Sequence, residues 1–211
     1  MRLYLSSFRL GDRPEQLLRL IDRSGPVAVL AHAMDGAPPE RRRAAVQLEI
    51  DALATIGLSA VEVDLRLGDP SRVTERLAGF AALWLRGGNA FVLRAGLAAT
   101  GADAAIVELL RGDQLVYAGY SAGPCVAGPT LRGLEAVDDV SAVRPTYGCE
   151  PVWDGLGLLD RPLVPHVESP GHPETADCTR LSRGWDEAGV SHWALRDGQA
   201  LVVDGDDVRL V

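Results

Sequence analysis

The stretch LVYAGYSAG, residues 115–123, decides the fold, because an apolar run leads directly into a serine flanked by glycines. The run at 115–118 predicts a strand covered on both faces, as in a parallel sheet. Gly-Tyr-Ser-Ala-Gly at 119–123 has the spacing of a nucleophile elbow, a sharp strand-to-helix turn that leaves the serine hydroxyl exposed. The alternative is an ordinary glycine-rich turn with an incidental serine, which the preceding strand disfavours.

The rest of the chain alternates short apolar runs with longer helical patterns. Four further runs predict core strands at residues 3–5, 27–31, 60–64 and 82–85. Apolar residues at helical spacing predict helices at 14–22, 39–56, 71–78, 90–100 and 102–111. After about residue 150 the pattern changes to short β-like segments separated by Asp-Gly turn signals at 154, 197 and 204, with a terminal hairpin at 199–203 and 208–211. The sequence therefore predicts an α/β fold: a doubly wound, mostly parallel sheet with a short antiparallel tail.

Composition limits the class of protein and its partners. The 211 residues are 47% apolar and 24% charged, which favours one domain over residues 1–211. A net charge of −8 argues against a nucleic-acid or membrane partner. The one basic run, residues 41–43, predicts a solvated helix face rather than an anion site.

The cysteines and the lack of long apolar segments predict the cellular compartment of the protein. No segment approaches the roughly twenty apolar residues that cross a bilayer, and the N-terminus lacks the apolar core of a signal peptide. The three cysteines lack metal-ligand spacing, so we expect reduced thiols. The expected location is cytoplasmic.

A serine hydroxyl needs an adjacent base before it becomes a good nucleophile. The chain has four histidines. His166 follows an apolar pair and a proline that would fix its backbone at a strand end, whereas His172 stands between Gly171 and Pro173 in a predicted loop. We therefore expect His166 to be the general base for Ser121.

The segment Arg86-Gly87-Gly88-Asn89 follows a predicted strand and precedes a predicted helix. Glycines at such a junction let backbone N–H groups approach a substrate closely. An oxyanion of acyl transfer requires donors of this kind. Taken alone, the segment is also compatible with an ordinary tight βα loop.

Three segments together resemble the motif series of the dipeptidase E family, peptidase family S51. They are LRGGNAF at 85–91, AGYSAG at 118–123, and VPH at 164–166 followed by GHPET at 171–175. The resemblance implies a flavodoxin-like fold similar to class I glutamine amidotransferases, with serine in place of their cysteine. It also implies a serine exopeptidase that hydrolyses short peptides and uses no metal or organic cofactor.

Carried onto this chain, the resemblance assigns the nucleophile to Ser121 and the base to His166. The oxyanion hole would be the backbone N–H groups of Gly88 and Ala122. Glu135 best matches the family's acid, and Asp138 and Asp139 are alternatives. The residues implied in substrate binding are Asn89, His172 and Glu174.

One departure from the family concerns specificity. Ala176 stands where the aspartate-specific relative carries an arginine, and alanine cannot bind a carboxylate. We therefore expect a relaxed preference for N-terminal aspartate, with Arg180 and Arg183 as the candidates for compensation.

Two alternatives to the dipeptidase reading stay open. A cyanophycinase-like hydrolase shares the serine elbow, but such relatives usually carry a glutamine in the loop at 87–90, which this chain lacks. The second alternative is a non-catalytic module that binds a small ligand, because a fold alone does not guarantee activity. The expected partner is a small peptide substrate, and a homodimer is an expectation from the family alone.

Overall fold

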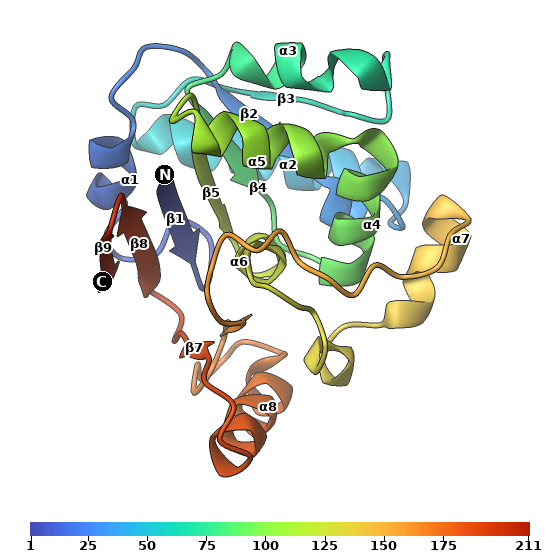
Figure 1. The fold of residues 1–211 in the computed structure, drawn as a ribbon, viewed down its shortest axis with the longest axis vertical. Coiled ribbons are helices and arrows are strands. Elements are labelled where there is room, and N and C mark those ends of the chain that lie inside the picture. The colour runs from blue at the N-terminus through green and yellow to red at the C-terminus, as the bar shows by residue number, and fades with distance from the viewer.

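The computed structural model describes all 211 residues and contains a seven-stranded sheet (Figure 1), in the order β3-β2-β4-β5-β1-β8-β9. The strands are β1 (Arg2–Ser6), β2 (Val27–Leu30), β3 (Ala60–Glu62), β4 (Ala82–Leu85), β5 (Val116–Tyr120), β8 (Ala200–Asp204) and β9 (Asp207–Leu210). The first five pair in parallel with one another, whereas β8 pairs antiparallel with β1 and β9 antiparallel with β8. The predicted doubly wound sheet with an antiparallel tail is confirmed.

Helices cover both faces of the sheet, and alternate strand residues supply the two cores. On one face α1 (Glu15–Leu20) and α2 (Pro39–Thr55) pack over a core that includes Trp84. The other face carries α3 (Val73–Ala78), α4 (Ala90–Thr100), α5 (Ala102–Arg111) and α6 (Ala122–Ala127). The larger core of 36 buried residues lies on this second face. The five helices predicted before residue 115 are therefore all present.

The carboxyl ends of the parallel strands lead into the loops that carry the candidate site. Ser7 follows β1, the 3-10 helix η1 (His32–Met34) follows β2, and the Arg86–Asn89 loop follows β4. Ser121 follows β5 directly. Ligands of open α/β sheets bind outside the carboxyl ends of the strands, so this edge is where a site is expected.

The segment after residue 120 is less regular and holds more helix than its pattern predicted. It contains α7 (Val143–Tyr147), α8 (Thr175–Glu187) and the short 3-10 helices η3 (Leu134–Ala136) and η4 (Val140–Ala142). A separate two-stranded sheet pairs β6 (Leu163–Val164) with β7 (Trp193–Ala194). A further 3-10 helix, η2 (Pro70–Arg72), precedes α3.

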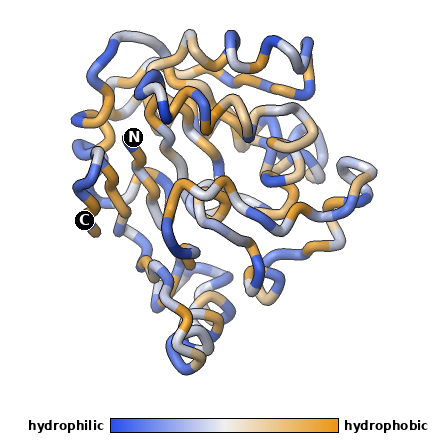
Figure 2. The backbone as a smooth tube through the Cα atoms, in the orientation of Figure 1, coloured by the Kyte–Doolittle hydropathy of each residue, from blue (hydrophilic) through white to orange (hydrophobic).

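The prediction of only short β-like segments after residue 150 was wrong for α8. This helix of 13 residues projects with β7 from the lower edge of the sheet in Figure 1. Only Cys178 and Ser182 are buried on it, and most of its 13 residues are charged or polar. Figure 2 shows the contrast: hydrophobic positions concentrate along the central strands, whereas hydrophilic ones recur along α8.

All three cysteines are free thiols, as expected; Cys125 and Cys178 are buried and Cys149 is exposed. No single helix combines the length and the apolar character needed to cross a membrane. Helices α4 and α5 meet that test only as a pair, bent by 84° between them.

Candidate active site

Ser121 occupies a strained turn between β5 and α6. Its backbone angles, φ 54° and ψ −104°, lie where side-chain-bearing residues are rarely found. The flanking glycines are required by close packing, because a Cβ at Gly119 would lie 2.4 Å from the Leu85 carbonyl oxygen and one at Gly123 would lie 3.1 Å from it. The predicted elbow therefore forms, and its strain is of the kind that proteins retain at functional positions.

The Arg86–Asn89 loop packs directly against this elbow. A Cβ at Gly87 would lie 3.0 Å from the Ser121 Cβ and 2.6 Å from the Tyr120 ring. Gly88 has φ 143° and is exposed, and a Cβ there would lie 2.7 Å from the Ala33 carbonyl oxygen. Gly87 thus allows the loop backbone to pack against the nucleophile, and Gly88 allows it to pack against Ala33.

A cavity of about 300 Å³ lies over the elbow and gathers most of the predicted residues. Ser121, His166, Gly88, His172 and Glu174 all line it. These residues come from segments up to 86 positions apart, so the tertiary fold brings together what the sequence motifs suggested separately. The buried Ala122 N–H belongs to the first turn of α6, next to Ser121.

His166 is held by two hydrogen-bonding neighbours from distant parts of the chain. Its Nδ1 lies 2.7 Å from Asp197 Oδ1, and its backbone N–H donates to Ser7 Oγ at 2.8 Å. The Ser7 hydroxyl in turn donates to the same Asp197 oxygen at 2.9 Å. His166 is 1% exposed and has φ 59°, and its Nε2 makes no hydrogen bond within the protein. The ring is thus fixed from one side and leaves its second nitrogen free.

The surroundings of His166 depress its pKa below the ordinary value for histidine. Burial is the largest cause, because desolvation disfavours the charged ring. The hydrogen bond that the ring donates to Asp197 raises the pKa, and the nearby His172 lowers it further. The lowered pKa favours the neutral ring, which is the state a general base requires.

None of the three acids that the sequence suggested contacts His166. Glu135 is exposed and its carboxylate accepts from the Gly133 N–H in its own turn. Asp138 accepts from the Ala90 N–H at 2.8 Å, and Asp139 accepts from the Ser141 N–H at 2.9 Å. The three acids follow the nucleophile closely in sequence, but the chain turns them toward the start of α4 and their own loops. The carboxylate at His166 is Asp197 instead.

Sequence reasoning missed both Asp197 and Ser7. Asp197 had one visible signal, the Asp-Gly pair at 197–198, which indicated only a turn. Ser7 had none, because a serine after a strand is common. Both reach His166 because β8 pairs with β1, which brings the residues before β8 beside those after β1.

Two of the three predicted substrate-binding residues line the cavity and one does not. His172 and Glu174 line the cavity, and the Glu174 N–H donates to His172 Nδ1 at 3.3 Å. Asn89 does not line it, contrary to expectation. Its Oδ1 caps α4 by accepting from the Val92 N–H, and its Nδ2 donates to the Asp139 carbonyl, so both ends of the amide are engaged.

One group of side chains has donor types and spacing that suit a metal ion. Ligand atoms of His166, His172 and Glu174 lie within 4.8 Å of one another. The two imidazoles, however, are parallel and stacked at 3.5 Å between centroids, so one ion cannot lie in the plane of both rings. The metal-free mechanism stays a prediction.

Ala176 and the two arginines proposed to compensate for it lie in a separate hollow along α8. Arg180 pairs with Asp177, and Arg183 lies 3.4 Å from Glu168. Neither arginine lines the cavity over Ser121. The anticipated compensation through Arg180 or Arg183 thus has no geometric basis.

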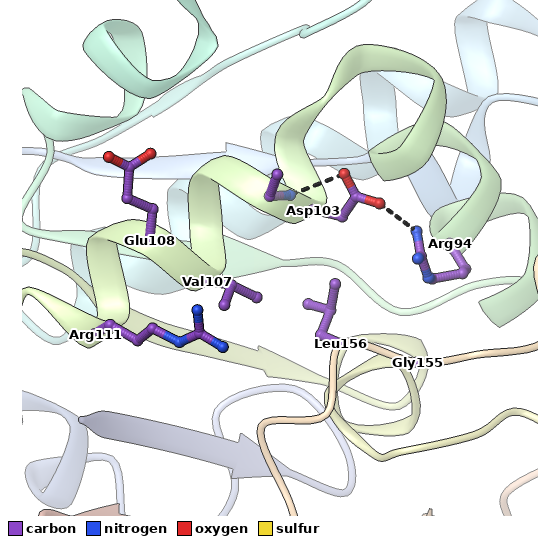
Figure 3. Close-up of a pocket in the computed structure, with 8 residues that line it drawn as sticks. Arg94, Asp103, Val107, Glu108, Arg111, Gly155 and Leu156 are labelled. Carbon is purple, nitrogen blue, oxygen red and sulfur yellow. Dashed lines mark hydrogen bonds and ion pairs between the residues drawn. The ribbon is translucent and has the colours of Figure 1, made fainter.

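A larger hollow of about 460 Å³ lies between α4, α5 and residues 155–156 (Figure 3). Its principal cation, Arg94, donates to Asp103 at 3.0 Å and to the Asp154 carbonyl at 2.7 Å. These bonds tie α4 to α5 and to the 150s segment, and no serine, cysteine or histidine lines the hollow. The reactive groups are therefore gathered at the smaller cavity.

Comparison with known proteins gives concordant matches. The model of peptidase family S51 matches residues 40–211. Peptidase E of Streptomyces coelicolor is 35% identical over 143 residues, which cover 66% of this chain and 54% of that protein. An uncharacterized peptidase of Listeria monocytogenes is 32% identical over 119 residues, covering 56% and 55%. The chain thus spans about half the length of the curated relatives it matches.

Solved structures match over the whole chain. A putative Peptidase E protein from Listeria monocytogenes superposes with a TM-score of 0.76 at 21% identity, covering 100% of this chain and 97% of that one. A peptidase from an acI-B1 actinobacterium gives 0.70 at 18% identity, covering 100% and 86%. At these identities the likeness establishes the fold. Because the family model matches most of the sequence and the motif series agrees with it, this chain belongs to peptidase family S51.

Proposed function

We propose that this chain is a serine exopeptidase that hydrolyses short peptides through Ser121, His166 and Asp197. One observation carries the proposal: a strained, cavity-facing serine shares its cavity with a buried histidine that a carboxylate holds at Nδ1. This is the set of roles that defines nucleophilic acyl transfer, whatever the positions in sequence.

In the proposed reaction Ser121 Oγ attacks the scissile carbonyl carbon while His166 Nε2 takes the hydroxyl proton. Asp197 holds Nδ1–H and stabilises the imidazolium that forms. His166 then protonates the leaving amine as the C–N bond breaks, which leaves an ester on Ser121. His166 then takes a proton from a water molecule as that water attacks the ester. It returns the proton to Ser121 Oγ as the bond between the acyl carbon and Oγ breaks, which releases the acid and restores the serine.

The oxyanion of the tetrahedral intermediate would lie between the backbone N–H groups of Gly88 and Ala122. The close packing of Gly87 against the elbow, and the place of Gly88 in the wall of the same cavity, support this assignment. Such donors are fixed before reaction, so they stabilise developing charge without reorganisation. No hydrogen bond joins Ser121 Oγ to His166 Nε2 here, and catalytic bonds of this kind often tighten only when substrate is bound.

The walls of the cavity favour an exopeptidase, because they offer a group that can anchor the free N-terminus of a short peptide. Glu174 offers a carboxylate to a substrate ammonium group, and His172 stands beside it. We therefore assign the free N-terminus of the substrate to Glu174.

A fluorophosphonate probe and a peptide panel test the proposal together. The wild type should be labelled at Ser121 and should release products from dipeptides and aminoacyl-p-nitroanilides. Ser121→Ala should lose both labelling and release, whereas Ser141→Ala should retain both, since the Ser141 hydroxyl donates only to Asp139 within its own turn and does not line the cavity.

Two results would contradict the proposal. An unlabelled wild type without turnover would favour a ligand-binding module. Degradation of an aspartate-rich polymer without any dipeptide cleavage would place the chain with cyanophycinase-like hydrolases.

A further inference from the structure

We propose that Arg9, Arg41 and Arg86 form a subsite that binds a carboxylate of the peptide substrate. The proposal rests on the function proposed above and adds the chemical class that the cavity prefers. All three arginines line the cavity over Ser121. They come from separate parts of the chain: Arg9 follows β1, Arg41 lies in the first turn of α2, and Arg86 follows β4.

The basic run at 41–43 does not behave as the uniform solvated face that its sequence predicted. Arg41 faces the cavity. Arg42 is buried and pairs with Glu62 and, at 2.8 Å, with Asp35. Arg43 is exposed, forms no ion pair and does not line the cavity over Ser121. Successive helix residues point about 100° apart, which is why three identical neighbours reach three environments.

The cavity wall carries more positive than negative side chains, which favours binding of an anion. Arg9 and Arg41 form no ion pair, although the chain carries 29 acidic residues and a net charge of −8. The one acidic partner of Arg86 is Glu49, at 3.5 Å; its Nη1 donates to the Gly87 carbonyl oxygen, and its Nε makes no hydrogen bond. The same Glu49 carboxylate already accepts from Trp84 and Tyr120. Glu174 is the one acidic residue that lines the cavity.

The backbone of Arg9 indicates that its position belongs to the site. Five residues other than glycine have positive φ, and three of them, Arg9, Ser121 and His166, line this one cavity. Arg9 has φ 49° and its guanidinium lies 5.3 Å from the centre of the Phe8 ring. Phe8 in turn packs edge-on against His166 and His172. Residues with strained backbone conformations cluster at active sites and ligand-binding sites.

Guanidinium groups bind carboxylates through paired, charge-assisted hydrogen bonds. A short peptide offers a carboxylate from two sources, its C-terminus or an acidic side chain on its first residue. Ala-Leu against its amide tests the first source. Asp-Leu amide against Asn-Leu amide tests the second.

Binding is measured calorimetrically in the Ser121→Ala protein, which does not turn over its ligands. In one of the two pairs the acid should bind about tenfold tighter than its neutral partner, equivalent to about 1.4 kcal/mol. Adding Arg9→Gln and Arg41→Gln together should bring that ratio to about one. Arg43→Gln, from the same helix, should leave the ratio unchanged. Raising the salt should also reduce the ratio, since Arg9 and Arg41 are exposed.

Equal binding within both pairs would overturn the subsite, and so would a ratio that survives the double substitution. This failure is distinct from failure of the proposed function. A chain that the fluorophosphonate probe labels, but that shows no carboxylate preference, loses only the subsite. A chain that shows the preference, but is neither labelled nor active on peptides, keeps the subsite and loses the peptidase.

Discussion

His172 covers one face of the His166 ring, with the two ring planes within 5° of parallel. After burial and the opposing bond from Asp197, the proximity of His172 is a further cause of the depressed pKa of His166. His172→Phe keeps an apolar cover over His166 and removes the titratable neighbour. The pKa of His166 should therefore rise, and the acid limb of the kcat/KM profile should move to higher pH.

Two measurements check the His172→Phe prediction: the pH profile of peptide hydrolysis and the NMR titration of the His166 ring. His192→Gln is the control, because His192 contacts Ser182 on α8 and does not line the cavity. An acid limb displaced to lower pH in His172→Phe would contradict the prediction.

Asp197→Asn tests which carboxylate orients the base. The substitution should lower kcat by about 10³–10⁴-fold, because the amide stabilises neither the correct tautomer nor the imidazolium. Since the Asp197 bond raises the pKa of His166, the residual activity should persist to lower pH than in the wild type. Glu135→Gln should stay within about twofold of wild-type kcat, because Glu135 bonds only within its own turn. A large loss in Glu135→Gln with an active Asp197→Asn would reverse the assignment.

Gly88→Ala should cost activity as well as stability. A Cβ there meets the Ala33 carbonyl oxygen at 2.7 Å in a backbone with φ 143°, so the loop has to move. We expect kcat to fall by about 10²-fold, as for loss of one oxyanion donor, and stability to fall by about 1–3 kcal/mol. Gly101→Ala is the matched control: its φ is 73° and nothing lies within 4 Å, so stability should fall while kcat holds. Equal kcat losses in both variants would remove the special role of Gly88.

Asp138 should make stability depend on pH. Burial raises its pKa to about 7, the Ala90 N–H opposes that rise, and Glu174 adds to it. A carboxyl group whose pKa is higher in the folded state contributes stability that is full below pH 4 and lost as the pH rises through about 7.

The corresponding variant is Asp138→Asn, which keeps an oxygen for Ala90 and removes the titration. Relative to the wild type it should gain about 1–3 kcal/mol between pH 4.5 and pH 8, measured by denaturant unfolding at each pH. Asp139→Asn, on the neighbouring exposed position, should show no such gain. A variant that tracks the wild type at both pH values would show that Asp138 is not desolvated.

The parts of the site that follow directly from strands were predictable, because strand, glycine and nucleophile are adjacent in the chain. This holds for the elbow at Ser121 and for the Gly87–Gly88 loop. Asp197 was not predictable, because it lies 31 positions after His166 in the sequence. The two residues come into contact only through the pairing of β8 with β1. The different environments of Arg41 and Arg42 were not predictable for a similar reason. The position of each residue around the helix axis, not its residue type, decides which one reaches the cavity.

The antiparallel pairing of β8 with β1 also orders events during synthesis. The chain emerges from the ribosome with its amino end first, so the elbow and the Gly87–Gly88 loop are available while residue 197 is still being added. His166 gains its carboxylate only when the strand that follows Asp197 docks beside the first strand of the protein. The contact between His166 and Asp197 therefore needs almost the whole chain, from the first strand to the last hairpin.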